Sequence, residues 1–160
     1  MYKKLLIISV CLFALTGCAT PSVLKSFLDL GVAVPQDYEE AAVRHFAEQG
    51  DAGAQFKLGT MYDQGTTVPQ DYKEAVKWYR MAAEQGVADA QLNLGVMYYL
   101  GTGVTQDYVI SYMWGSLAAA SGEKAVKLVD LAAKKITPQQ ISDAQEMARN
   151  CLANNYKGCD

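Results

Sequence analysis

Histidine and cysteine side chains most often carry catalysis or metal binding, and this sequence contains few of them. His45 is the one histidine; it lies between Arg44 and Phe46, and no nucleophile-elbow motif accompanies it. Ser-His-Asp and Cys-His catalysis would both require it. We therefore expect His45 to be a half-exposed structural residue. Metal sites need clustered ligands, and because the sequence shows no such cluster we predict no metal and no cofactor.

Cys18 follows a segment with the features of a targeting signal. Lys3 and Lys4 are followed by the apolar run Leu5–Ala14, which is too short to span a bilayer as a stable helix. The Leu-Thr-Gly stretch before Cys18 resembles the bacterial lipobox. That resemblance implies a diacylglyceryl group on the Cys18 thiol, cleavage before Cys18 and acylation of its new amine. The alternatives are an ordinary secretory signal or a buried apolar strand.

Lipidation at Cys18 would hold the protein at a membrane. Each buried methylene of an acyl chain contributes about 0.8 kcal/mol, so several chains give a firm anchor. Ala19 follows the cysteine. In Gram-negative lipoproteins an Asp at this position tends to retain the protein at the inner membrane, so the resemblance implies the outer membrane. We expect a lipid-anchored protein of the bacterial envelope, on the periplasmic face of the outer membrane.

Cys151 and Cys159 remain once Cys11 leaves with the signal segment and Cys18 carries lipid. The residues near them include Asn and Gly, which favour turns. In an oxidising periplasm we expect the pair to form a disulfide, which would stabilise the fold by about 2–3 kcal/mol. The alternative is two free thiols on a frayed tail. We do not expect a structural zinc site, because two cysteines without a nearby histidine cannot supply four ligands.

The charge of the chain excludes one class of partner. Its 14 basic and 17 acidic residues give a formal net charge of −3, and loss of Lys3 and Lys4 would make the charge more negative. Because no basic cluster remains, we predict no nucleic-acid binding. Membrane contact should come from the lipid. The length suits one domain with a core of its own, and we expect a monomer.

The body of the chain repeats a pattern at intervals of 36 residues. Ala54–Tyr62 recurs as Ala90–Tyr98, and Gly65–Tyr72 recurs as Gly101–Tyr108. An earlier copy, Gly31–Tyr38, lies 34 residues before the middle one, so the helix after it should be two residues shorter. Three copies of one long pattern predict a repeat protein.

Each repeat is predicted to form two helices. Asp71 should cap the start of one helix, with Glu74 completing a capping box, and Gly86 should end it in a left-handed conformation. The next helix should cover residues 88–100, where Gly95 would let a neighbouring helix approach closely. One apolar stripe is predicted along the first of these helices: Tyr72, Ala75, Tyr79, Ala82 and Ala83.

The repeat pattern stops after Gly122. An amphipathic helix is predicted over residues 123–135. Thr137 and Pro138 then provide a strong helix start, and that last helix should reach about Cys151. We expect these two helices to cap the open end of the stack, because a terminal repeat needs a polar outer face.

The repeat resembles the Sel-one-like repeat, a relative of the tetratricopeptide repeat. The motif Ala-x-x-x-Leu-Gly-x-x-Tyr occupies Ala54–Tyr62, Gly-x-x-Val-x-x-Asp-Tyr occupies Gly65–Tyr72, and Ala-x-x-Trp-Tyr-x-x-Ala-Ala-x-x-Gly occupies Ala75–Gly86. The resemblance implies an all-α fold: a right-handed α-solenoid of antiparallel helix pairs, a TPR-like superhelix that binds other proteins. In this family the motif residues serve packing and turns. This sequence departs from the pattern in its first unit, which lacks a recognisable first helix, and at Thr105, which replaces a proline.

The predicted organisation has four parts. They are a cleaved signal peptide (1–17), a lipidated tether (18–26), one partial and two full repeats (27–121), and a helical cap with a disulfide-closed tail (122–160).

An enzyme is the alternative to a binding scaffold. Some cysteine-rich relatives of this repeat have been linked to penicillin binding, β-lactamase activity or peptidoglycan, and Ser-x-x-Lys tetrads occur here at Ser22–Lys25 and Ser121–Lys124. The Ser-Asp-Asn and Lys-Thr-Gly partners of serine β-lactamases are missing, and so are the paired cysteines of those relatives. We therefore expect a non-catalytic protein.

The first helix of each repeat offers candidate partner-binding residues away from its core face. Several are larger or more apolar than a solvated face requires, and in related solenoids this helix lines the concave surface. The alternative is that two of them, Phe56 and Leu92, only stack adjacent repeats. Trp78 and Trp114 are expected to be packing residues. The candidates are Phe56, Thr60, Asp63, Leu92, Val96 and Tyr99, which would bind an unknown protein or peptide.

Overall fold

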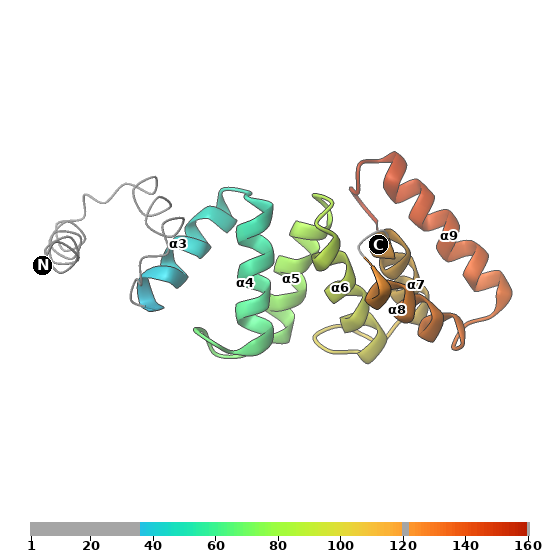
Figure 1. Cartoon of the computed structure of the whole chain (residues 1–160), viewed down its shortest axis with the longest axis horizontal. Coiled ribbons are helices and arrows are strands. Elements are labelled where there is room, and N and C mark those ends of the chain that lie inside the picture. Colours follow the sequence, from blue (N-terminus) through green and yellow to red (C-terminus); the bar gives the residue numbers. More distant parts are fainter. Residues whose placement is uncertain (1–35, 120–121, 160) are drawn as a thin grey trace, which may run out of the picture. The chain divides into compact units, whose positions relative to one another are not determined.

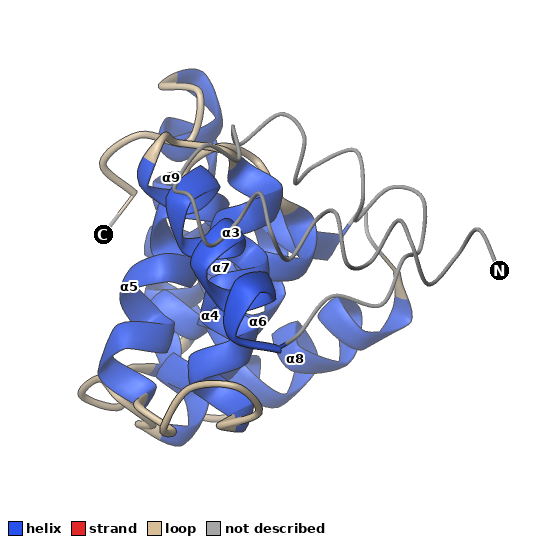
Figure 2. Cartoon of the chain, turned by 90° about the vertical axis from the view of Figure 1, so that its left-hand side faces the viewer, coloured by secondary structure: helices blue, strands red, loops and turns tan. Residues whose placement is uncertain are grey.

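The computed structural model describes residues 36–119 and 122–159, and the packing below concerns residues 43–159, which belong to one compact unit. Every regular element in the described residues is a helix (Figures 1 and 2), so the predicted all-α class is confirmed. The helices are α3 (Gln36–Glu48), α4 (Ala52–Gln64), α5 (Tyr72–Ala83), α6 (Ala88–Leu100), α7 (Tyr108–Ala118), α8 (Glu123–Ala133) and α9 (Pro138–Ala153).

Aspartate side chains start the helices that follow the long turns. The Asp71 carboxylate accepts hydrogen bonds from the backbone N–H groups of Lys73 and Glu74, and Asp107 does the same one repeat later. The predicted capping box at Glu74 does not form. The Asp71 N–H already donates to the carbonyl of Tyr62 at 3.0 Å, and the Glu74 carboxylate pairs with Lys77.

Helix boundaries agree closely with the prediction in the second and third repeats. α6 covers the expected residues, and Gly101 ends it with φ +72°. α9 has the predicted Thr137 capping box, and it continues two residues beyond Cys151. α8 ends two residues earlier than expected. The prediction of a shortened first helix is wrong. α3 begins at Gln36, earlier than the position equivalent to the start of α5 at Tyr72, and this earlier start makes up for the two residues that the first copy lacks.

Identical side-chain contacts join each helix pair to the next. Gln55 and Gln91 are buried, and their amides donate to the carbonyls of Ala47 and Ala83, near the end of the preceding helix, at 3.1 and 3.2 Å. These carbonyls belong to the last turns of α3 and α5, and each also accepts a backbone N–H from the following turn, that of Gly50 or Gly86. A second repeated contact is a guanidinium–phenol hydrogen bond, Arg44 to Tyr62 and Arg80 to Tyr98.

Glycines in the first helix of each repeat allow close packing, as predicted for Gly95. A Cβ atom added at Gly59 would lie 2.7 Å from the ring of Tyr79, and one at Gly95 would lie 2.9 Å from Leu128. Gly115 occupies the position of Tyr79 in the next repeat, so no ring is available there. Leu128 of α8 fills that space instead. A residue of the C-terminal cap thus makes the contact that a repeat residue, Tyr79, makes with Gly59.

The core has two parts. A smaller cluster joins α3, α4 and α5 and contains Trp78, and the larger one extends from α5 to the C-terminus and contains Trp114. Trp78 and Trp114 are 6% and 0% exposed, which confirms them as packing residues. Tyr72 departs from the predicted stripe: it is the first residue of α5 and is 40% exposed.

The C-terminal tail folds back onto the repeats. The structure contains a disulfide between Cys151 and Cys159, with both residues buried. Tyr156 lies inside this closed loop with φ +63°, and its ring packs against Gly86 in the turn between α5 and α6. The tail therefore covers the junction of two helices of the second and third repeats.

Candidate functional site

The six predicted binding residues belong to two helices that occupy equivalent places in successive repeats. Phe56, Thr60 and Asp63 lie on α4 and are all partly buried. Leu92 and Tyr99 on α6 are also partly buried, whereas Val96 is 36% exposed. The two groups of residues have different surroundings.

The α4 group is organised around Tyr79 of α5. The Phe56 and Tyr79 rings lie 5.8 Å apart between centroids. The Tyr79 hydroxyl is 3.3 Å from Thr60 Oγ1 and 3.3 Å from the Asp63 carboxylate. Because Tyr79 itself is fully buried, these contacts hold α4 against α5. The contacts favour the packing interpretation of Phe56 over a partner-binding one.

The environment of Tyr79 changes its ionisation. Burial raises the pKa of its phenol above the ordinary value of 10.0, and the nearby Asp63 carboxylate raises it further. Hydrogen bonding to Thr60 and Asn93 acts in the opposite direction. Asn93 belongs to α6, so the one hydroxyl interacts with groups on both α4 and α6.

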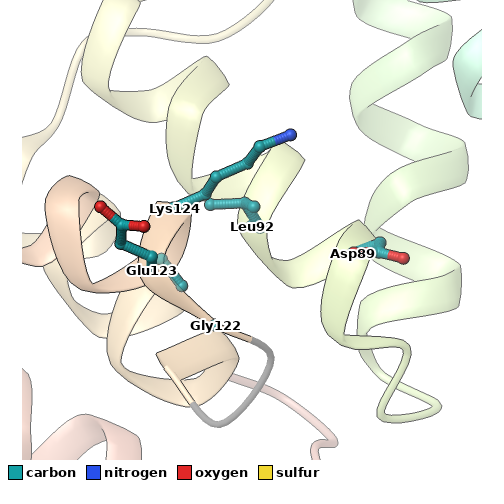
Figure 3. A pocket seen from close by; sticks show the side chains of 6 residues that line it. Asp89, Leu92, Gly122, Glu123 and Lys124 are labelled. Carbon is teal, nitrogen blue, oxygen red and sulfur yellow. The ribbon is translucent and has the colours of Figure 1, made fainter.

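The α6 group is more open. Leu92 lines a pocket of about 380 Å³ together with Asp89 of α6 and the first residues of α8, including Lys124. Figure 3 shows Leu92 and Lys124 side by side, with Glu123 directed away from them. Tyr99 packs edge-on against Tyr108, with 5.3 Å between ring centroids, and it also packs against the larger core cluster. Val96 remains available at the surface.

Sequence reasoning did not identify the contribution of α8 to this surface. Leu131 is 46% exposed, and it lies one turn after Leu128, which packs on Gly95 of α6. The repeat pattern stops before α8, so the 36-residue spacing that located the other candidates could not locate Leu131.

Several other candidate residues can be placed or set aside. His45 is exposed and makes an edge contact with Phe46, so it is less buried than expected. Cys18, Ser22, Lys25 and Ser121 lie outside the described residues. Over residues 36–119 and 122–159, no three His, Cys, Asp or Glu side chains gather as a metal site. Within the same residues, no helix has the length and apolarity needed to cross a membrane.

Comparison with known proteins identifies the repeat. The model of the Sel1 repeat matches residues 27–49, 52–87 and 88–123. The structure resembles c5321, a protective antigen present in uropathogenic Escherichia coli strains displaying an SLR fold, with 29% identity and a TM-score of 0.70. It also resembles a Sel1 repeat protein from Oxalobacter formigenes, with 28% identity and a TM-score of 0.56.

These similarities cover most of this chain but less of the matched proteins. The first covers 87% of this chain and 30% of the c5321 chain, and the second covers 82% and 64%. No curated protein matches the sequence. Sel1 repeat proteins mediate protein–protein interactions and are typically non-catalytic. Since the repeat model matches more than half of the sequence, the chain belongs to the Sel1 repeat family.

Proposed function

We propose that this protein is a lipid-anchored lipoprotein of the bacterial envelope that acts as a non-catalytic scaffold for a protein or peptide partner. The anchor is Cys18, and the binding surface is formed by the outward residues of α6 together with α8. The leader features before Cys18 support the first part. The second rests on Val96, an apolar side chain that stays 36% exposed beside Leu92 and its pocket.

We place the candidate surface on its α6 half, because the α4 residues already pack against Tyr79. Phe56, Thr60 and Asp63 are engaged with Tyr79, so a partner would meet them only at their edges. Val96 has no such partner in the described core clusters. An exposed apolar side chain next to a partly open pocket is a suitable anchor point for a partner's side chain.

The test is partner capture from intact cells with the lipidated protein and a short crosslinker. Val96→Asp should abolish capture of the crosslinked partner while leaving the helical circular dichroism signal and the Tm unchanged. Leu152→Asp is a matched control because Leu152 is 50% exposed on α9, far along the chain from the proposed surface. Equal capture by wild type and Val96→Asp would reject the surface.

The enzymatic alternative can be tested on the same preparation. Lys124 of the second Ser-x-x-Lys tetrad lines the α6–α8 pocket, whereas Ser121 lies outside the described residues. We expect neither nitrocefin turnover nor stable acylation by labelled penicillin. Labelling that is lost in Ser121→Ala would establish the alternative and overturn the non-catalytic assignment.

A further inference from the structure

Asp63 lies in the last turn of α4, where a negative charge is unfavourable. The backbone carbonyls at the C-terminal end of a helix carry partial negative charge, so a cation stabilises this end and a carboxylate destabilises it. α4 has no basic residue in its last turn. Asp63 also forms no ion pair with any other described residue, so its charge is uncompensated within residues 36–119 and 122–159.

The repeat itself does not require a carboxylate at the position of Asp63. The residue 36 positions later is Tyr99, whose ring packs on Tyr108. α4 and α6 end at the same place in the repeat, and each is followed by a glycine in the left-handed conformation. An aromatic side chain therefore suits this position, and neither packing nor the turn accounts for Asp63.

The hydrogen bonds around Asp63 contain more acceptors than donors. The Tyr79 hydroxyl has one proton and lies 3.3 Å from both Asp63 Oδ2 and Thr60 Oγ1. Thr60 does not supply a second proton, because its hydroxyl donates to the carbonyl of Phe56 at 3.0 Å. Asp63 Oδ1 accepts no hydrogen bond from the described residues. The carboxylate can therefore accept further hydrogen bonds from a group outside the fold.

The ionisation of Tyr79 agrees with an uncompensated charge on Asp63. Burial is the largest effect and raises the pKa of the Tyr79 phenol, and the Asp63 carboxylate raises that pKa further. A cation paired with Asp63 would weaken this second effect.

Asn93 connects this site to the exposed apolar residue of α6. Its side chain also interacts with the Tyr79 hydroxyl, and α5 packs against both α4 and α6 (Figure 1). Val96 follows Asn93 by one helical turn and is 36% exposed. The Tyr79 hydroxyl thus lies between Asp63 and the turn of α6 that carries Val96.

We propose that Asp63, beside Asn93, binds a basic side chain of the partner, and that the guanidinium group of arginine fits best. This proposal rests on the scaffold function above and specifies the chemistry of the partner at the α4 edge of the surface. The guanidinium donates to the free Oδ1 atom of Asp63, supplies the donors that the site lacks, and places a positive charge at the C-terminal end of α4. A carboxylate from the partner would be repelled at this position.

The proposal can be tested by NMR titration of isotope-labelled, purified full-length protein. The probe is a capped Leu-Arg-Leu peptide, whose leucines can contact Val96. The control peptide carries citrulline, which is neutral and similar in shape, in place of arginine. We expect saturable chemical-shift changes at Thr60, Asp63 and Asn93 with the arginine peptide only, and weaker binding as salt is raised.

Matched variants separate Asp63 from general attraction to an acidic protein. Asp63→Asn should weaken binding of the arginine peptide by about tenfold or more. Its Tm should equal or exceed that of wild type, because the substitution removes an unfavourable charge from the end of α4. Asp130→Asn makes the same change at an exposed residue of α8 and should bind as wild type does.

Three results would overturn the proposal. They are equal binding by wild type and Asp63→Asn, equal binding of the arginine and citrulline peptides, and a lower Tm for Asp63→Asn, which would show that the carboxylate serves the fold.

Failure of this inference can be distinguished from failure of the scaffold function. If the arginine peptide causes no saturable shift at Asp63 while Val96→Asp still abolishes capture from cells, the proposed partner chemistry is wrong and the scaffold stands. If the peptide binds at Asp63 while cells yield no crosslinked partner, the basic-group site is supported and the scaffold function fails.

Discussion

The Tyr79 hydroxyl is a polar group at the centre of the repeat packing. It lies between Thr60 and Asp63 of α4 and also interacts with Asn93 of α6. The apolar stripe predicted Tyr79 as a core residue, and the structure confirms that. The hydrogen-bond partners could not be predicted, because they depend on how far α4 and α6 are rotated about their own axes, and the repeat spacing carries no information on that.

Replacement of Tyr79 by Phe should change both the stability and its dependence on pH. At neutral pH the lost hydroxyl interactions should lower the free energy of unfolding by about 1 kcal/mol. The pKa of Tyr79 is raised in the folded state, so the unfolded chain loses this proton first as pH rises above 10.0. The Tyr79 contribution is therefore fully present below pH 10 and is lost at more alkaline pH.

The measurement is urea denaturation of wild type and Tyr79→Phe at several pH values from 7 upward. The difference in unfolding free energy should shrink as pH passes 10. Tyr72→Phe is the control, because Tyr72 is 40% exposed and its replacement leaves the surroundings of Tyr79 unchanged. A difference for Tyr79→Phe that does not change with pH would contradict the assigned environment.

At the scale of elements, turn and cap residues made the helix boundaries predictable. Asp71, Thr137 and Gly101 each mark a helix end by a local mechanism that acts within four residues. At the end of the stack, Leu128 fills the space that Tyr79 fills in the preceding repeat, and this contact was not predictable in this way. Leu128 packs beside Gly115 but belongs to another helix, and nothing in the local pattern of α8 indicates that this leucine would fill the space.

Gly59 offers a test of whether close helix approach requires glycine. Alanine has a higher helix propensity by about 1 kcal/mol, which would stabilise an exposed position. At Gly59 the added methyl would lie 2.7 Å from the buried Tyr79 ring, and such overpacking costs about 1–3 kcal/mol. We therefore expect Gly59→Ala to lower the free energy of unfolding.

Gly53→Ala in the same helix is the matched control. Its nearest neighbour would be the exposed Asp51 carboxylate at 3.3 Å, which caps α4 through the Ala54 N–H and needs to shift by only a few tenths of an ångström, so this variant should be clearly less destabilised than Gly59→Ala. Urea denaturation of both variants gives the comparison. The packing argument fails if Gly59→Ala is as stable as Gly53→Ala.

At the scale of the whole molecule, the repeat and its all-α class were predictable because the 36-residue pattern specifies one helix pair that must stack on its neighbours. The candidate site was only partly predictable. Positions on α4 and α6 followed from the pattern, but the same pattern could not distinguish Phe56, which packs on Tyr79, from Val96, which stays exposed. Phe56 has the Tyr79 ring to pack on, whereas the residue 36 positions after Tyr79 is Gly115, which offers no ring to α6.

The lipid anchor at Cys18 makes a prediction about the protein in its cell. If Cys18 carries acyl chains, cells supplied with labelled palmitate should yield labelled protein in the membrane fraction, extractable with detergent but not with high salt. Cys18→Ser should remove the label and the membrane association together, because Cys18 is the residue proposed to carry all the acyl chains. Cys159→Ser is the matched control: it breaks the Cys151–Cys159 disulfide but leaves Cys18, so it should retain the label.

Palmitate label that persists in Cys18→Ser would show that lipid is attached elsewhere. Unlabelled wild-type protein in the soluble fraction would instead reject the anchor.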